Sequence, residues 1–371
     1  MTATERLTVA LGARSYEIAI GAGLLQRAGD ELRKVLRQPR AIVVTDRHLA
    51  ATAHLAALEA SLQAAKVEFR TVVVPAGEGS KSLAELERLL ERILDSGIER
   101  GTTLIAFGGG VVGDLAGFAA AILLRGIDYV QIPTSLLAQV DSAVGGKTGI
   151  NARQGKNLIG SFHQPRLVLS DTAVLASLPP RQLRAGYAEV AKYGVIERPA
   201  FFAWLEQHGG AVLAGDAAAQ QHAIVESCRA KAALVASDER EQGARTLLNL
   251  GHTFGHALEA LTGYGERLLH GEAVALGIVL AAALSVRLGL CPAADLERIR
   301  RHFAAVGLPT ARAQVGAESF AAEALLAAMA HDKKAQGQRP RFVLLRGIGQ
   351  AFTGVAVEPA ELLALLSASD P

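Results

Sequence analysis

The chain has 371 residues, of which half are hydrophobic and 20% are charged. This composition is typical of a globular protein with room for two domains, and it excludes a disordered chain. The formal net charge is +2 and the chain has no run of basic residues, so composition gives no support for nucleic-acid binding.

Cysteine usage and the apolar runs bear on the cellular compartment. Cys228 and Cys291 lie far apart in sequence, which favours neither a disulfide framework nor a CxxC metal site. The N-terminal segment has charged residues where a signal peptide would need its apolar core. The longest apolar runs are too short or too interrupted to span a bilayer. We expect a cytoplasmic protein that does not enter a membrane.

The first half of the chain alternates strand and helix signals. Residues 7–11 and 16–21 predict an N-terminal hairpin. Residues 82–97 predict a helix that begins at Ser82, with Glu85 three residues later. Such alternation predicts a mostly parallel sheet covered on both faces, with ligands at the carboxyl ends of its strands. Further strands are predicted at 41–46, 69–75, 103–110, 128–134 and 166–171.

The pattern changes after residues 178–182. Residues 183–335 are rich in Ala and Leu and predict long helices with few strands. A strand-like pair at 341–346 and 351–357 precedes a short final helix. The sequence therefore predicts an α/β domain over residues 1–180 and a mainly helical domain over residues 181–371.

A glycine-rich segment at residues 108–114 directly follows the strand-like residues 103–107. Gly108, Gly110 and Gly113 satisfy the pattern G-x-G-x-x-G, which lets a backbone approach a pyrophosphate at a helix N-terminus. The segment lies beyond the first strand–helix unit, and Asp128 precedes the next strand instead of ending it. A tight strand-to-helix turn without a ligand therefore remains an alternative.

Residues 141–151, DSAVGGKTGIN, resemble the end of a nucleotide-triphosphate P-loop around Lys147. The P-loop pattern requires a glycine five residues before Gly146, and that position is Asp141. A carboxylate there would repel a phosphate, so this segment does not predict an ATP site. Two readings remain, a glycine turn with a solvated lysine and a site for another anion.

Polar side chains recur at the ends of successive predicted strands. Asp46 ends an early strand, where a carboxylate can bond ribose hydroxyls. Glu78 and Lys81 follow the next strand, and Thr134, Ser135 and Asp141 follow a later one. Together they predict one ligand-binding edge, although each alone could be an ordinary cap or turn residue.

The helical half contains the densest polar pattern. Arg245, Asn249, His252 and His256 are spaced by 4, 3 and 4 residues, which predicts one stripe on a helix. His252 and His256 have a metal-binding spacing, but the glutamate of an HExxH zinc protease motif is missing.

A metal site is predicted from residues on three segments. His270 supplies a third histidine, and Glu189 lies among Ala and Val residues with Lys192 three residues later. A glutamate in such surroundings is expected to be paired or to bind a metal. Two histidines and one glutamate form a catalytic zinc set with an open position. The spacing does not separate His252 from His256, and a hydrogen-bonded structural role remains possible for any one histidine.

Basic residues beside Gly, Asn or Asp favour a small anionic substrate. A solvated surface role is an equal alternative for Lys231 and for the pair Lys333-Lys334. The residues concerned are Lys147, Lys156, Lys192, Lys231, Arg245, Lys333 and Lys334.

Six long motifs, in order over most of the chain, closely resemble the 3-dehydroquinate synthase family of sugar phosphate cyclases. They occupy residues 108–120, 133–151, 155–165, 186–196, 248–259 and 270–277. The resemblance implies an N-terminal Rossmann-like NAD-binding α/β domain and an all-α C-terminal metal- and substrate-binding domain. It also implies NAD and Zn²⁺ as cofactors, with Co²⁺ able to replace zinc, and a homodimer.

The reaction that this resemblance implies converts 3-deoxy-D-arabino-heptulosonate 7-phosphate to 3-dehydroquinate and phosphate, within the shikimate pathway. It would combine transient oxidation by NAD, elimination of phosphate, re-reduction and an intramolecular aldol closure.

The resemblance also implies roles for individual residues. The metal ligands would be Glu189, His252 and His270, with His256 contacting substrate. Substrate would also contact Arg125, Lys147, Asn157, Lys192, Lys231, Arg245, Asn249 and one of Lys333 or Lys334. NAD would contact Asp46, Glu78, Lys81, Gly109, Gly110, Val111, Val112, Gly113, Asp114, Thr134, Ser135, Asp141, Lys147, Lys156 and Ser177. The chain departs from the family's pattern at Ser135, which keeps a hydroxyl, and at Ala143, which loses one.

Three other functions predict different residues or products. A sibling cyclase that makes another carbocycle should lose the groups that bind the substrate carboxylate, whereas Arg245 and the pair Lys333-Lys334 are present. A metal-dependent polyol dehydrogenase would release NADH at each turnover and would need no phosphate site. An inactive paralogue should have lost part of the set Glu189, His252 and His270.

Overall fold

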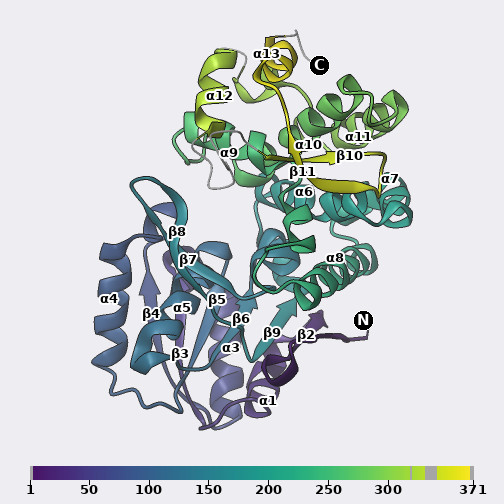
Figure 1. The fold of residues 1–371 in the computed structure, drawn as a ribbon. Helices are drawn as coiled ribbons and strands as arrows, with labels where there is room; N and C mark the ends of the chain where they lie inside the picture. Colours follow the sequence, from purple (N-terminus) through teal and green to yellow (C-terminus); the bar gives the residue numbers. More distant parts are fainter. Residues whose placement is uncertain (1–2, 318–319, 331–340, 368–371) are drawn as a thin grey trace. The chain divides into compact units, whose positions relative to one another are not determined.

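A computed structural model describes residues 3–317, 320–330 and 341–367. The predicted substrate lysines Lys333 and Lys334 lie outside the described residues. The chain divides into two compact units, and Figure 1 labels most of their helices and strands. The first unit comprises residues 1–178 and 217–240, and the second comprises residues 179–216 and 241–371.

The first unit contains a seven-stranded sheet with the order β1-β2-β9-β6-β5-β3-β4. β1 pairs antiparallel with β2, which confirms the predicted N-terminal hairpin, and the other neighbours pair in parallel. The strands are β1 (Glu5–Val9), β2 (Tyr16–Gly21), β3 (Arg40–Asp46), β4 (Glu68–Val74), β5 (Thr103–Gly108), β6 (Tyr129–Pro133) and β9 (Leu167–Asp171).

Side chains of the central strands alternate between two hydrophobic clusters. In β3, Ile42 and Val44 belong to one cluster, whereas Ala41 and Val43 belong to the other. A sheet that is buried on both faces needs helices on both faces. One cluster contains residues of α4 (Leu83–Leu94) and α5 (Gly110–Ile122), and the other contains residues of α1 (Ala28–Arg33) and α3 (Ala53–Ala64). This confirms the predicted parallel sheet with two covered faces.

The helical elements of this unit are short except for α3, α4, α5 and α8. Ser82 accepts a hydrogen bond from the backbone N–H of Glu85 and so caps α4, as predicted. The helices are α1 (Ala28–Arg33), α2 (Arg47–Ala50), α3 (Ala53–Ala64), α4 (Leu83–Leu94), α5 (Gly110–Ile122) and α8 (Ala217–Ser237). The short 3₁₀ helices are η1 (Gly12–Arg14), η2 (Leu25–Arg27), η3 (Glu78–Ser80), η4 (Leu123–Arg125) and η6 (Thr172–Ser177), and η5 (Ala138–Ser142) is a short π-helix.

A second, two-stranded sheet was not predicted. β7 (Lys147–Ala152) and β8 (Gly155–Phe162) form an antiparallel hairpin within the first unit. Gly149 and Gly160 pair directly across it, and a Cβ on Gly160 would lie 2.1 Å from the carbonyl oxygen of Thr148. The two strands can approach this closely only because neither glycine has a side chain. The same glycines obscure the alternating pattern by which a strand is predicted from sequence.

The sequence placed α8 in the helical half of the chain, whereas the structure groups it with the first unit. Its buried side chains pack against η5, β1 and β2. Cys228 Sγ donates to the carbonyl oxygen of Gln139 at 3.2 Å, and Lys231 bonds to Asp141. The sequence of an Ala-rich helix does not indicate which unit the helix packs against, because its packing partners are remote in sequence.

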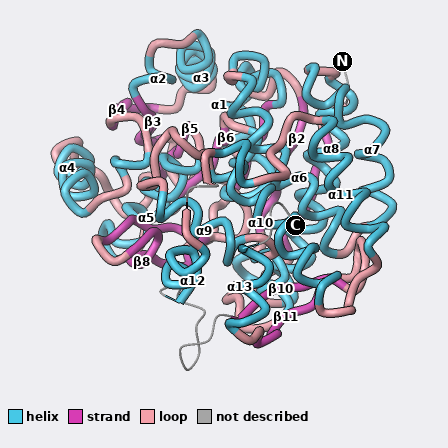
Figure 2. Tube along the Cα trace, turned by 90° about the horizontal axis from the view of Figure 1, so that it is seen from above, coloured by secondary structure: helices cyan, strands magenta, loops and turns pink. Residues whose placement is uncertain are grey.

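The described residues of the second unit are mainly helical and include one hairpin of strands, as the colours of Figure 2 show. The hairpin and the final helix confirm the prediction for residues 341–367. Its elements are α6 (Pro180–Ile196), α7 (Pro199–Ala214), η7 (Ala244–Asn249), α9 (His252–Leu261), α10 (His270–Arg287), α11 (Ala293–Ala305), η8 (Arg312–Val315), α12 (Ala322–Ala330), β10 (Arg341–Leu345), β11 (Ala351–Ala356) and α13 (Pro359–Ser367).

One helix, His270–Arg287, is apolar and long enough to cross a membrane among the residues that the structure describes. Its most apolar window has a mean hydropathy of 1.4, and 78% of that window is buried inside the protein. α10 is therefore a core helix of this unit, packed against α6, α9 and α11.

A buried tyrosine–histidine pair joins α6 to α11. Tyr187 OH lies 3.1 Å from His302 Nε2, and both side chains are at most 4% exposed. Burial lowers the pKa of His302 to about 4, and the carboxylate of Glu206 offsets this only in part. His302 is therefore neutral in the folded protein at neutral pH.

This pair makes the stability of the second unit sensitive to acid. Between pH 6.5, the ordinary pKa of histidine, and pH 4, the unfolded chain binds a proton that the folded chain excludes. The free energy of unfolding should thus fall by about 3 kcal/mol as the pH drops through this window. Replacing His302 by Gln should remove that component, as measured by denaturant unfolding at several pH values. An unchanged difference between pH 7 and pH 4 in the variant would contradict the assignment.

Candidate metal centre and nucleotide edge

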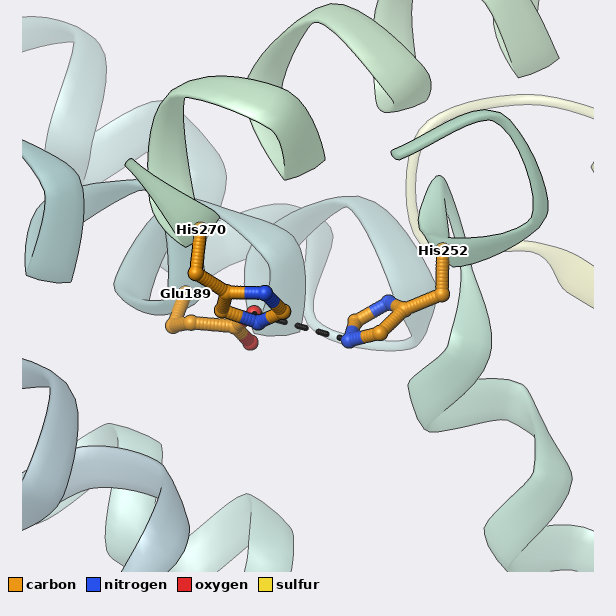
Figure 3. A group of neighbouring side chains, drawn as sticks. All are labelled: Glu189, His252 and His270. Atoms are coloured by element: carbon orange, nitrogen blue, oxygen red, sulfur yellow. Dashed lines mark ion pairs between the residues drawn. The ribbon is translucent and has the colours of Figure 1, made fainter. Parts of the chain in front are cut away.

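Three side chains from three helices of the second unit converge on one point. Glu189 comes from the middle of α6, His252 from the first residue of α9 and His270 from the first residue of α10 (Figure 3). Their potential ligand atoms all lie within 4.8 Å of one another. His252 Nε2 and His270 Nε2 lie 3.8 Å and 3.5 Å from Glu189 Oε1. Two imidazoles and a carboxylate at this separation can bind one divalent cation.

The carboxylate of Glu189 fits a cation better than it fits its protein surroundings. The side chain is fully buried, yet neither oxygen accepts a hydrogen bond of normal geometry. Lys192 Nζ, one turn along α6, forms an ion pair with Oε2. A buried carboxylate without hydrogen bonds is costly, and a metal ion bound at Oε1 would remove that cost.

His270 also shows the attraction of this site for positive charge. Burial lowers the pKa of His270, but the carboxylates of Glu259 and Glu189 outweigh it and raise the pKa to about 10. A proton on His270 and a metal ion beside it satisfy the same negative charges, so the two compete for the site.

Close backbone contacts bring the three helices together. A Cβ on Gly271 would lie 1.8 Å from the carbonyl oxygen of Ala185, four residues before Glu189 on α6. A Cβ on Gly277 would lie 2.0 Å from the carbonyl oxygen of Gly251, the residue before His252. Each histidine is therefore next to a glycine at a contact that admits no side chain.

The predicted stripe of four polar residues on one helix is wrong. Arg245 and Asn249 lie in η7, and the chain turns at Leu250-Gly251 before α9 begins at His252. Gly251 has a φ of 80°, a left-handed conformation that interrupts a helix and that glycine adopts without strain. Arg245 is 1% exposed, and Asn249 Nδ2 donates to Glu241 Oε1.

His256 lies one turn beyond His252 on α9. Its ring centroid is 5.4 Å from that of His252, with perpendicular planes, and 6.5 Å from that of His270. His256 is not part of the cluster of ligand atoms around Glu189. The geometry thus separates the two histidines that the spacing alone left equivalent.

In the first unit, Lys81 connects several residues of the predicted nucleotide edge. Its ammonium group lies 2.6 Å from Asp114 Oδ2 and 3.8 Å from Glu78 Oε1, and it donates to Asn157 Oδ1. Lys81 is 5% exposed. Burial raises the pKa of Asp114, and Lys81 opposes this shift through its charge and its hydrogen bond.

Asn151 joins the β7–β8 hairpin to the same cluster. Its amide donates to Glu78 Oε1 at 2.8 Å, and its side-chain oxygen accepts from the backbone N–H of Asn157 at 3.0 Å. The backbone N–H of Asn151 donates to the carbonyl oxygen of Lys81 at 2.8 Å. The sequence alone does not indicate a role for Asn151, because an asparagine in a glycine-rich segment is typical of a turn.

The glycine-rich segment makes a close turn from strand to helix. β5 ends at Gly108, Gly109 is the N-cap of α5 and Gly110 is its first residue. A Cβ on Gly110 would lie 2.9 Å from Ser142 Oγ, and one on Gly113 would lie 2.7 Å from Gln131 Oε1. Val111 and Val112 complete the first turn. An N-terminus of this kind, at the carboxyl end of a parallel strand, can receive a phosphate.

The residues after β6 lie beside this turn. Thr134 donates its backbone N–H to the carbonyl oxygen of Gly108 at 3.0 Å. A Cβ on Gly109 would lie 3.6 Å from Ser135 Oγ. Asp141, in η5, forms an ion pair with Lys231 of α8, and Lys231 Nζ also donates to the carbonyl oxygen of Asp141 at 2.6 Å.

The remaining predicted residues of the first unit lie at other positions. Asp46 caps α2 by accepting from the backbone N–H of His48 and Leu49, so its side chain has a structural role of its own. Lys147 is the exposed first residue of β7, and Lys156 and Asn157 lie in β8. Arg125 ends η4 with a φ of 70°, and Ser177 Oγ bonds to His54 Nε2.

Comparisons with known proteins agree over both units. The family model described as 3-dehydroquinate synthase N-terminal matches residues 71–185, and the model described as 3-dehydroquinate synthase C-terminal matches residues 186–335. A 3-dehydroquinate synthase of Rhodospirillum rubrum is 62% identical over 364 residues, which cover 98% of this chain and 94% of the relative.

Solved structures of sugar phosphate cyclases share the fold. ValA, a 2-epi-5-epi-valiolone synthase from Streptomyces hygroscopicus with NAD⁺ and Zn²⁺ bound, has a TM-score of 0.87 at 30% identity and covers 96% of this chain and 97% of its own. A 2-deoxy-scyllo-inosose synthase complexed with carbaglucose-6-phosphate, NAD⁺ and Co²⁺ has a TM-score of 0.86 at 25% identity, covering 98% and 99%.

Proposed function

The chain belongs to the 3-dehydroquinate synthase family, and from this premise we propose that it converts 3-deoxy-D-arabino-heptulosonate 7-phosphate to 3-dehydroquinate and phosphate. The observation that carries the proposal is the buried cluster of Glu189, His252 and His270 with Lys192 beside it. A metal centre with a cation next to it suits a polar, anionic substrate.

The proposed metal is Zn²⁺, with Co²⁺ as a substitute, held by Glu189, His252 and His270. The donor set supports this choice, since two imidazoles and one carboxylate leave one coordination position for substrate. When bound, the metal would supply Lewis-acid polarisation of a substrate oxygen, and NAD⁺ would supply reversible hydride transfer.

The proposed NAD-binding residues all belong to the first unit. The short strand-to-helix turn at Gly109 and the cluster around Lys81 support the assignment, because the N-terminus of α5 offers backbone N–H groups to a pyrophosphate. The full proposed set is Asp46, Glu78, Lys81, Gly109, Gly110, Val111, Val112, Gly113, Asp114, Thr134, Ser135, Asp141, Lys147, Lys156 and Ser177.

The proposed substrate residues divide by the group that each binds. Lys147, Lys192 and Asn157 bind and orient the phosphate, whose own oxygens can accept the proton that is removed in the elimination. Arg245 binds the carboxylate with its planar guanidinium. His256, Asn249, Lys231 and Arg125 complete the set of substrate contacts.

A sibling cyclase that uses another sugar phosphate is the nearest second candidate. It is disfavoured because identity to the 2-epi-5-epi-valiolone synthase is 30%, against 62% to a 3-dehydroquinate synthase. The buried Arg245 also supports a substrate that carries a carboxylate. We further propose that the protein acts in the cytoplasm as a homodimer, as the resemblance to the family implies.

One assay tests the proposed reaction. The purified protein is incubated with the heptulosonate phosphate, Zn²⁺ and NAD⁺ at a catalytic concentration, while phosphate and 3-dehydroquinate are both followed. The expected result is that the two products form in equal amounts without net NADH. Stoichiometric NADH would instead indicate a dehydrogenase, and the absence of phosphate release would refute the proposal.

A further inference from the structure

Glu259 is a buried carboxylate next to the proposed metal centre and outside its set of ligands. It is 1% exposed and lies near the end of α9, seven residues after His252. Two helical turns place residues seven apart on the same face, so α9 directs both side chains toward the start of α10. Glu259 Oε2 lies 3.2 Å from His270 Nδ1.

We propose that Glu259 is a positioning residue for the metal centre. Its carboxylate accepts a hydrogen bond from the Nδ1–H of His270 and thereby directs the Nε2 lone pair of that ring to the metal. The inference rests on the proposed function, because it assumes that Glu189, His252 and His270 bind the metal. It adds a residue that holds a ligand in place without touching the metal itself.

The tautomer of His270 follows from the chemistry of its partner. An ionised carboxylate only accepts hydrogen bonds, so the ring nitrogen facing Glu259 must carry the proton. In the neutral imidazole the other nitrogen, Nε2, then has a lone pair. This atom is the one that lies 3.5 Å from Glu189 Oε1 and faces the centre of the cluster.

His252 is held in the same way by the backbone. Its Nδ1 lies 3.2 Å from the carbonyl oxygen of Leu250, which also only accepts, and its Nε2 lies 3.8 Å from Glu189 Oε1. Both rings therefore present Nε2 to the same point. A substitution can remove the Glu259 carboxylate, whereas no substitution can remove the backbone carbonyl of Leu250, so only the partner of His270 can be tested by mutation.

The charge of Glu259 gives it a second effect on the metal. An imidazole bound to a cation carries part of the positive charge, and a carboxylate hydrogen-bonded to its other nitrogen stabilises that charge. Glu189 is already paired with Lys192, so the second carboxylate increases the negative charge available to a divalent ion. Loss of Glu259 should weaken metal binding even though all three ligands remain.

The experiment measures metal binding by the full-length protein, without reference to turnover. Zn²⁺ affinity is determined by competition with a chromophoric chelator for the unmodified protein and for Glu259→Gln. The amide has nearly the same shape but has no charge, and its NH₂ group can donate to Nδ1 and favour the wrong tautomer. We expect affinity to fall by roughly 10- to 100-fold.

Ser285→Ala is the matched control. Ser285 is buried on α10, the helix of His270, where its hydroxyl donates to the carbonyl oxygen of Ala281 at 2.7 Å and accepts from the backbone N–H of Leu345 at 3.0 Å. This variant should have a lower Tm with unchanged Zn²⁺ affinity. If Ser285→Ala lowered Zn²⁺ affinity as much as Glu259→Gln, the loss of affinity would reflect a general destabilisation of the fold, and the inference would be overturned.

Two further outcomes separate the inference from the proposal beneath it. If the unmodified protein binds Zn²⁺ and Glu259→Gln binds it within about two-fold, the positioning role is refuted and the metal site stands. If the unmodified protein binds no divalent metal, both fail. Should Glu259→Gln not fold, ¹⁵N NMR of the histidines in the zinc-loaded unmodified protein decides the matter. A proton on Nδ1 of His270 is expected, and one on Nε2 would overturn the inference.

Discussion

Replacing His252 by alanine is expected to lower Zn²⁺ affinity by roughly 10³-fold and to abolish turnover, because the variant lacks one of the three proposed protein ligands to the metal. Its Nε2 lies 3.8 Å from Glu189 Oε1, within the cluster of ligand atoms. Affinity is measured by chelator competition and turnover by phosphate release. Full zinc occupancy in this variant would show that the ligand set is wrong.

His256→Ala is the matched comparison, since it removes the same kind of side chain one turn further along α9. Its ring lies beside those of His252 and His270 but outside the ligand cluster. We expect Zn²⁺ affinity within about three-fold of the unmodified value and a loss of roughly 10²-fold in kcat/KM, as for a group that contacts substrate. The opposite pattern in the two variants would exchange their roles.

This comparison bears on what the sequence could predict. Residue types were enough to predict which residues could form the cluster, because a glutamate among apolar helix residues and histidines in a segment rich in leucine are both unusual. They could not choose between His252 and His256, since spacing along one helix says nothing about where other helices lie. The choice depends on Gly251, which ends the preceding turn and makes His252 the first residue of α9.

Other features that the sequence did not predict also depend on contacts between residues that are remote in sequence. The β7–β8 hairpin depends on contacts between glycines such as Gly149 and Gly160, which have no strand propensity to reveal it. α8 packs on a sheet formed by residues far from it in sequence. Glu259 could have been noticed, because it lies two turns from His252 in a helical pattern, but the proposal of a role for it depends on the position of His270.

The glycine next to His270 leads to the second large expected effect. Gly271→Ala should reduce the free energy of unfolding by about 3 kcal/mol or more, because overpacking a tight contact costs roughly 1–3 kcal/mol even where the neighbours can move. Here the added Cβ would lie 1.8 Å from the carbonyl oxygen of Ala185, a backbone atom inside α6. Denaturant unfolding with a chelator present measures this cost without any contribution from bound metal.

The same substitution should also weaken metal binding, although it changes no ligand. α10 can relieve the clash only by moving away from α6, and that movement separates His270 from Glu189, whose Nε2 and Oε1 atoms are 3.5 Å apart. We expect Zn²⁺ affinity to fall at least about 10-fold, since ligand positions must hold to a few tenths of an ångström.

Gly210→Ala in α7 is the control, because a Cβ there meets nothing within 4 Å. That variant should keep its zinc affinity and gain about 0.4–1 kcal/mol of stability from the less flexible unfolded chain. If Gly271→Ala behaved like Gly210→Ala in both measurements, the contact between α6 and α10 would not be what sets the spacing of the proposed ligands.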